Sequence, residues 1–192
     1  MAATGSVDLL DRTLAQTEAI VARVRPEQAT LPTPCASWDV RALVNHLVHD
    51  VRQFTAAVHG GEGGPKDADV IGDDWAGAYR QAASALLAAW RRPGALEGTI
   101  RLPFGDFPAT WRLGQQIADL AVHGWDVAKA TGQPTDLDPE VGQFALDWSR
   151  ENLKPEFRGD EASGRAFGPE VAVAADAALY DRLAGFFGRD PR

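Results

Sequence analysis

The sequence contains a single cysteine, Cys35, and no long hydrophobic run. One thiol cannot form a disulfide within the chain, which is typical of proteins from a reducing cytosol. A membrane-spanning helix needs about 20 consecutive apolar residues, and no stretch approaches that length. The first residues also lack the basic segment and apolar segment of a secretory signal. These absences predict a cytoplasmic protein.

Positive charge is scarce as well. The 19 Lys and Arg residues are outnumbered by 27 Asp and Glu residues, so the net charge at pH 7 is −8. Proteins that bind nucleic acids or anionic membranes use basic side chains to neutralise phosphates. The charge balance therefore argues against both kinds of partner. The 192 residues are 45% hydrophobic, which predicts one globular domain over residues 1–192.

Hydrophobic residues recur at steps of three and four, the spacing of one face of an α-helix. This periodicity predicts helices over residues 7–24, 37–59, 74–92, 110–130, 138–153 and 177–187. Ser6, Ser37 and Thr110 are the predicted N-caps, because their hydroxyls can accept hydrogen bonds from the first N–H groups of a helix. Alternating residues predict a short β-hairpin within residues 98–109.

The predicted helix over residues 110–130 is apolar around most of its circumference, which indicates a largely buried helix. Its polar residues nevertheless form one stripe, because they recur at steps of four, three, four and three: Arg112, Gln116, Asp119, His123 and Asp126. The stripe is either a solvated face or the lining of an internal cleft. Asp119 and His123 are four residues apart, so their side chains meet on one face and could chelate one cation.

The other histidines and the cysteine allow simpler interpretations. On a helical wheel, His46 lies at the edge of its helix's apolar stripe, whereas His49 points away from it and is predicted to be solvated. His59 lies at the end of the same helix, and a surface or half-buried histidine without a functional role is the simpler interpretation of all three. Cys35 precedes a helix start, where a thiol pKa can be lowered. Packing as a small apolar side chain is its simpler role.

Two long motifs resemble a known family. The stretch TPCASWDVRALVNHL over residues 33–47 is similar to the opening of the second helix in the mycothiol-dependent maleylpyruvate isomerase N-terminal domain family, part of the DinB-like superfamily. The stretch ADLAVHGWDVAKATG over residues 118–132 resembles its second motif. The segments FGP at 167–169 and GRDP at 188–191 resemble the ends of its small actinobacterial members.

The resemblance implies an all-α fold: a DinB-like up-and-down four-helix bundle with a short β-hairpin. The bundle would span about residues 6–154 and a C-terminal extension about residues 155–192. It also implies a divalent metal, usually zinc with iron or nickel as alternatives, held by His46, Asp119 and His123. Three protein ligands leave a coordination position for water or substrate, as in catalytic zinc sites.

By the same resemblance, the chain would be a thiol-utilising transferase or isomerase with mycothiol as co-substrate and a small electrophile as substrate. A cation deprotonates a thiol that coordinates it, and the thiolate is the nucleophile. Arg112 is predicted to pair with a substrate carboxylate, with Gln116 beside it. The alternatives are a non-catalytic protein that binds a metal or small ligand, and a metal-dependent hydrolase. A homodimer is a further expectation.

The chain departs from the isomerase at two points. The isomerase carries glutamate at the position of Asp119, and aspartate is shorter by one carbon, so the helix must lie closer to the metal. The isomerase also has a second, C-terminal domain. Only about 40 residues follow the predicted helix over residues 138–153, too few for that domain.

Overall fold

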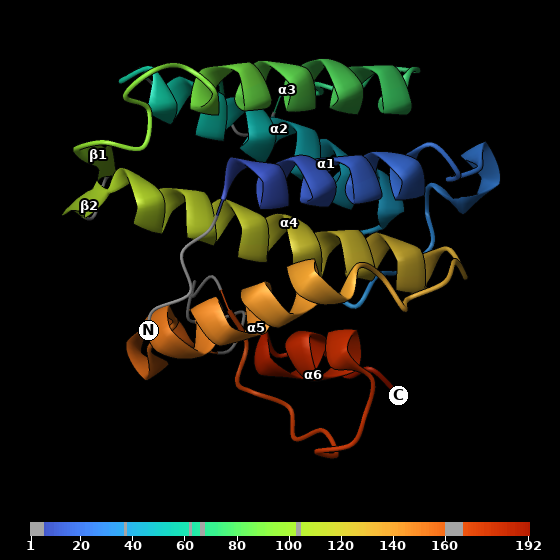
Figure 1. The fold of residues 1–192 in the computed structure, drawn as a ribbon. Helices are drawn as coiled ribbons and strands as arrows, with labels where there is room; N and C mark the ends of the chain where they lie inside the picture. Colours follow the sequence, from blue (N-terminus) through green and yellow to red (C-terminus); the bar gives the residue numbers. More distant parts are fainter. Residues whose placement is uncertain (1–5, 37, 62, 66–67, 103–104, 160–166) are drawn as a thin grey trace.

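The computed structural model describes residues 6–36, 38–61, 63–65, 68–102, 105–159 and 167–192 (Figure 1). Its α-helices are α1 (Val7–Val21), α2 (Val40–Val58), α3 (Trp75–Trp90), α4 (Ala109–Ala130), α5 (Pro139–Asn152) and α6 (Leu179–Phe186). Two 3₁₀ turns, η1 (Pro26–Gln28) and η2 (Pro155–Phe157), lie in the connections. Strands β1 (Thr99–Leu102) and β2 (Gly105–Pro108) form an antiparallel hairpin with Thr99 opposite Pro108. The predicted helical fold with one short hairpin is confirmed.

Helices α1 to α4 form the predicted four-helix bundle. Helix α1 packs against α3 and α4, and α2 packs against the same two helices. Helix α5 lies on the outer side of α4, and α6 packs against α5 and α4 (Figure 1). Helix α4 therefore has neighbours on several sides, which explains why it is buried around most of its circumference.

Helices α2 and α3 run in the same direction. At their starts, the Arg41 guanidinium lies 5.5 Å from the centre of the Trp75 ring. At their ends, Arg92 contacts His59. The chain thus returns to the starting end of the bundle between α2 and α3, so the predicted up-and-down alternation is wrong at this step. Long connections of this kind are one established variation of the four-helix bundle.

The helix starts confirm some predicted caps and correct others. Ser6 caps α1 through its hydroxyl, which accepts from the Leu9 N–H at 3.0 Å. Helix α2 begins later than predicted, with Asp39 as its cap, and the predicted cap Ser37 lies outside the described residues. The predicted Thr110 cap is wrong because β2 runs directly into α4: Pro108 precedes the helix, and no side chain caps it.

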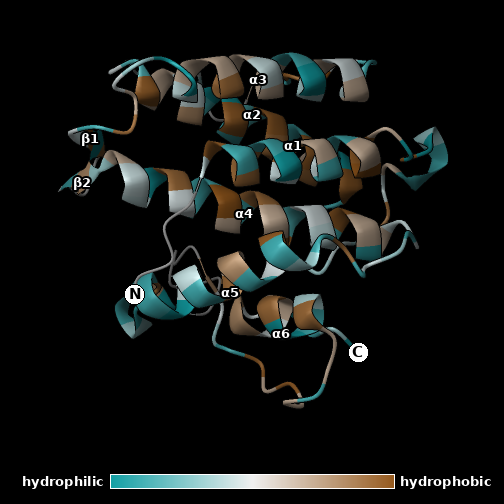
Figure 2. Ribbon diagram, viewed as in Figure 1, coloured by the Kyte–Doolittle hydropathy of each residue, from teal (hydrophilic) through white to brown (hydrophobic). Residues whose placement is uncertain are grey.

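The core lies between the helices of the bundle. Figure 2 shows hydrophobic and hydrophilic residues sharing the same helices, as expected for elements that bury one face. Gly114 lets α5 approach α4 closely, since a Cβ there would lie 2.3 Å from the Trp148 Nε1 atom.

Among the described residues, no helix is long and apolar enough to span a membrane.

Candidate functional site

The polar stripe of α4 faces the protein interior. Gln116 and Asp126 are fully buried, Arg112 is 8% exposed, and His123 is 7% exposed. Only Asp119 keeps appreciable exposure, at 20% of its side chain. A solvated face would show the opposite pattern. The stripe is therefore a buried polar surface inside the bundle, and the interpretation as a solvated face is wrong.

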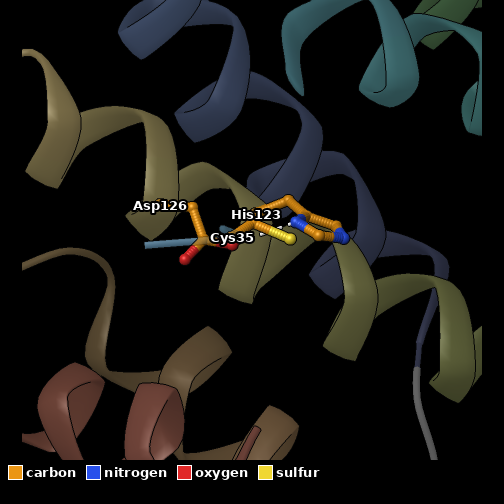
Figure 3. Close-up of side chains that lie close together, drawn as sticks. All are labelled: Cys35, His123 and Asp126. Carbon is orange, nitrogen blue, oxygen red and sulfur yellow. Dashed lines mark hydrogen bonds and ion pairs between the residues drawn. The ribbon is translucent and has the colours of Figure 1, made fainter. Parts of the chain in front are cut away.

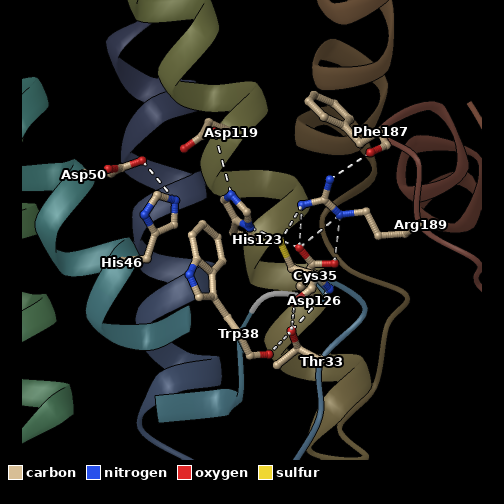
Figure 4. A network of polar contacts seen from close by, with 10 residues as sticks. All are labelled: Thr33, Cys35, Trp38, His46, Asp50, Asp119, His123, Asp126, Phe187 and Arg189. Carbon is tan, nitrogen blue, oxygen red and sulfur yellow. Dashed lines mark hydrogen bonds and ion pairs between the residues drawn. The ribbon is translucent and has the colours of Figure 1, made fainter. Parts of the chain in front are cut away.

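Two imidazole rings meet where α2 faces α4. The ring centroids of His46 from α2 and His123 from α4 lie 5.1 Å apart in an edge-to-face arrangement (Figure 4). Trp38, just before α2, lies against both: its ring centroid is 4.1 Å from that of His46 and 5.9 Å from that of His123. The indole covers one side of the histidine pair and limits how far the rings can turn.

Two carboxylates complete this group. Asp119 Oδ1 lies 3.9 Å from His123 Nε2, and Asp50 Oδ2 lies 3.2 Å from His46 Nε2 (Figure 4). The second oxygen of Asp119 is buried and has no hydrogen-bond partner in the described part of the chain. A buried carboxylate oxygen without a donor is costly. His46 and Asp119 thus each lie near His123, and Asp50 lies beside His46.

Asp50 was missed as a site residue in the sequence, although a signal for it exists. It follows His46 by four residues, the same spacing that links Asp119 and His123. Side chains four apart on a helix meet on one face. Pairing the histidines with acidic residues at this spacing on both helices would have identified it.

Burial, and next the negative charge of Asp119, raise the pKa of the Asp50 carboxyl to about 7, while His123 and His49 partly oppose the rise. The folded chain therefore holds this proton more tightly than the unfolded chain. Protonated Asp50 therefore adds to the free energy of unfolding. This contribution is complete below about pH 4 and is lost as the pH rises through about 7. The region disfavours a second negative charge when no cation is present.

The Asp50→Asn variant keeps the shape of the side chain and removes its ionisation. In metal-free protein above pH 7 we expect it to raise the free energy of unfolding by on the order of 2 kcal/mol. At about pH 4 the effect should nearly vanish, since Asp50 is then protonated in the folded chain. Urea unfolding at the two pH values measures both. An equal effect at both would contradict the raised pKa.

The opposite side of His123 is held by a buried ion pair. His123 Nδ1 donates to Asp126 Oδ2 at 3.0 Å, and the Arg189 guanidinium donates to both Asp126 oxygens at 3.0–3.3 Å. Burial alone would raise the pKa of Asp126, but Arg189 and then His123 outweigh it and lower that pKa. Burial would likewise lower the pKa of His123, but the bond to Asp126 and the charge of Asp119 raise it. An ionised Asp126 only accepts, so His123 carries its proton on Nδ1.

A second set of possible ligands shares His123. Ligand atoms of Cys35, His123 and Asp126 lie within 4.8 Å of one another and could hold a metal ion (Figure 3). However, Arg189 already binds both Asp126 oxygens and donates to Cys35 Sγ at 3.7 Å. A guanidinium on the same carboxylate repels a cation. The sequence analysis missed this cluster because Cys35 and Arg189 lie far from α4 along the chain.

The remaining histidines lie outside this group. His59 is exposed at the end of α2, which confirms its surface position. The prediction that His49 is solvated is wrong, since it is only 6% exposed. The connection after α2 folds back over it and places the Gly64 carbonyl oxygen 3.4 Å from His49 Nε2. A helical wheel describes one helix and cannot show such a cover.

Arg112 and Gln116 both lie inside the bundle. The Arg112 guanidinium lies 4.7 Å from the centre of the Phe54 ring and donates to Gln115. Burial lowers the pKa of Arg112, and the charges of Asp119 and Asp50 oppose this. Gln116 accepts from the Trp90 indole N–H at 2.8 Å. Arg112 Nε and Gln116 Nε2 are buried donors without a partner in the described part of the structure.

Together, the fold and this site define a helical-bundle protein in which histidine and aspartate side chains of α2 and α4 meet inside the bundle. Residues 10–128 match the model of the family described as the mycothiol maleylpyruvate isomerase N-terminal domain. The match spans more than half of the chain, so the protein belongs to this family, as the resemblance implied. The helical fold is consistent with a DinB-like bundle.

Two relatives come from Mycobacterium tuberculosis: uncharacterized protein MT0763 of strain CDC 1551 / Oshkosh and uncharacterized protein Rv0738 of strain ATCC 25618 / H37Rv. Each is 34% identical to this chain over 177 residues, which cover 91% of this chain and 92% of the relative. No solved structure matches the chain. Because 91% of the chain is covered, the similarity extends through α5, beyond the residues matched by the family model.

Proposed function

We propose that this protein is a divalent-metal-dependent enzyme that uses a small-molecule thiol, with His46, Asp119 and His123 as its metal ligands. The observation that carries the proposal is the gathering of two imidazoles and two carboxylates between α2 and α4, with one Asp119 oxygen left without a donor. A cation would balance the negative charge of the two carboxylates and would bind the buried Asp119 oxygen that lacks a donor. Zinc is the first candidate, since imidazole and carboxylate are among its usual ligands; iron and nickel are the alternatives.

The chain's own residues also favour this ligand set. Asp126 accepts the His123 Nδ1 proton, so the lone pair of neutral His123 is on Nε2, the nitrogen nearer Asp119. Histidine ligands of metals commonly donate their other ring proton to a carboxylate in this way. When bound, a divalent metal would lower the pKa of a coordinated thiol and so supply a thiolate at neutral pH. Mycothiol is the proposed thiol, on the strength of family membership.

The proposed electrophilic substrate carries a carboxylate that Arg112 and Gln116 bind. Their unpartnered donors lie one turn apart on α4, on the face that continues to Asp119. A carboxylate is the most favourable partner for a buried guanidinium, because it can accept two hydrogen bonds from it. Arg112 also lies in the second turn of α4, near the positive end of the helix dipole. Trp90 holds the oxygen of the Gln116 amide and so directs its NH₂ group.

A Gln116→Glu variant tests this substrate site. Glutamate keeps an oxygen for the Trp90 N–H but replaces the NH₂ donor with negative charge. We expect KM for a carboxylate-bearing electrophile to rise by on the order of tenfold or more, the cost of losing about one charge-assisted hydrogen bond. Gln143→Glu, on the exposed face of α5, is the control and should leave KM unchanged. Unchanged KM in both variants would remove Gln116 from the substrate site.

Thiol use is tested by cobalt substitution. Full-length protein carrying Cys35→Ser, and so free of its own thiol, is loaded with Co²⁺ and titrated with mycothiol. Direct sulfur coordination should produce a thiolate-to-cobalt charge-transfer absorption in the near ultraviolet. The His123→Ala form of the same protein should lack it. Absence of this absorption in cobalt-loaded protein would contradict thiol binding at the metal.

Turnover then separates the alternative functions. A thiol-dependent transferase or isomerase consumes an electrophile only when both metal and thiol are present. A metal-dependent hydrolase, in which the metal activates water, would act without thiol. A non-catalytic binding protein would show no turnover with metal and thiol both supplied.

A further inference from the structure

The C-terminal segment after α6 sends one arginine into the site. Arg189 is 7% exposed although it lies near the end of the chain. Its Nε and Nη2 atoms donate to Asp126, and its Nη1 donates to the Phe187 carbonyl oxygen at 2.8 Å (Figure 4). Every nitrogen of the guanidinium therefore has an acceptor. This residue is not among residues 10–128, which the family model covers.

The backbone around Arg189 is built to hold it in place. The Arg189 N–H donates to the Ala184 carbonyl oxygen at 2.9 Å and so ties the segment to α6. Gly188 has a φ of +85°, a conformation that other residues rarely adopt, and a Cβ there would lie 2.9 Å from the Gly168 Cα. Lys129 of α4 donates to the Pro191 carbonyl oxygen at 2.6 Å and fixes the segment on the other side of Arg189.

We infer that Arg189 is a positioning residue for His123: by binding both oxygens of Asp126 it holds that carboxylate in place as the acceptor for His123 Nδ1, so that His123 keeps its proton on Nδ1. Asp126 has no exposed surface, so without Arg189 its charge would be buried beside His123 alone. Such a carboxylate would turn towards another donor, and the His123 tautomer would then be unspecified. The C-terminal segment thus acts on the site through two successive contacts. Arg189 binds Asp126, and Asp126 binds His123.

The same contact selects between the two possible sets of metal ligands. While Arg189 binds both Asp126 oxygens, Asp126 serves as the partner of His123 rather than as a ligand. His123 then presents Nε2 on the side of Asp119. The consequence for metal affinity rests on the proposed function, but the His123 tautomer does not.

The first measurement is the tautomer of His123 in metal-free, full-length protein. Ring ¹⁵N chemical shifts are recorded by NMR at mildly alkaline pH, where the imidazole is neutral. We expect wild-type protein to show the Nδ1–H form and Arg189→Gln to show a mixture of both forms. Arg189→Lys keeps the charge and should restore part of the Nδ1–H population. Arg192→Gln, in the same segment but exposed and paired with Asp190, is the control and should match wild type.

The second measurement is zinc affinity. Removing the partner of a ligating histidine typically weakens metal binding on the order of 10- to 100-fold, and we expect a loss in this range for Arg189→Gln with partial recovery in Arg189→Lys. Circular dichroism establishes that each variant is folded. A folded Arg189→Gln with the wild-type tautomer overturns the inference. If both Arg189 variants unfold, an Nε2–H form in wild type still overturns it. If wild type binds no zinc, the proposed function fails, and the tautomer alone decides the role of Arg189.

Discussion

Replacing His123 with alanine is expected to remove the bound ion from the purified protein. His123 is central to the proposed site, since its ring contacts that of His46 and its Nε2 faces Asp119. Wild-type protein, purified without a histidine tag, should contain about one ion per chain by elemental analysis, the stoichiometry of a single mononuclear site. His46→Ala and Asp119→Ala should also lose the ion, with an unchanged circular dichroism spectrum. His59→Ala, directly after α2, exposed and outside the site, is the matched control.

The same series distinguishes the two possible ligand sets. If the ligands are His46, Asp119 and His123, then Cys35→Ser should retain the ion. If the ion instead binds Cys35, His123 and Asp126, then Cys35→Ser should lose it and Asp119→Ala should keep it. A wild-type protein that contains no ion after incubation with zinc, iron and nickel would contradict both sets. The stripe of α4 would then be a buried polar network without a metal.

The second large effect concerns stability. Replacing Asp126 with alanine is expected to lower the free energy of unfolding by about 3–5 kcal/mol, the usual cost of removing one partner of a buried ion pair. Arg189 would lose the acceptor of its Nε and Nη2 donors while staying buried, and His123 would lose its Nδ1 acceptor. Urea unfolding at pH 7 measures the change. A loss below about 1 kcal/mol would mean that Arg189 finds another partner or reaches water.

The control for this variant is Asp190→Asn, next to Arg189 in the same segment. Asp190 pairs with Arg192 in an exposed position, so its replacement should change stability little. The stability contribution of Asp126 also depends on pH. Because its pKa is lowered in the folded chain, the contribution is present at neutral pH and is lost as the pH falls through that lowered pKa. Asp126→Ala should not show this loss.

These two experiments measure different properties of one network. Loss of the ion in His123→Ala with stability retained would identify a ligand. Loss of stability in Asp126→Ala would identify the buried pair that supports that ligand. The Arg189 variants connect the two, because Arg189 contacts Asp126 directly and His123 only through it.

Sequence alone was sufficient where short-range spacing decides the outcome. Helices α1 to α6, the Ser6 cap and the hairpin each depend on residues within a few positions of one another. The pairing of Asp119 with His123 is local in the same sense, because one turn of helix brings the two side chains together. The family motifs supplied His46, which no spacing within α4 could indicate.

Only the tertiary structure decided what surrounds these residues. His49 is buried because the connection after α2 folds over it, and α2 and α3 are parallel because that connection spans the bundle. Cys35 and Arg189 reach His123 and Asp126 through contacts between distant parts of the chain. Periodicity reports which face of a helix is apolar, but not which distant segment covers that face. Burial and charge compensation, which govern the chemistry of this site, arise from those distant segments.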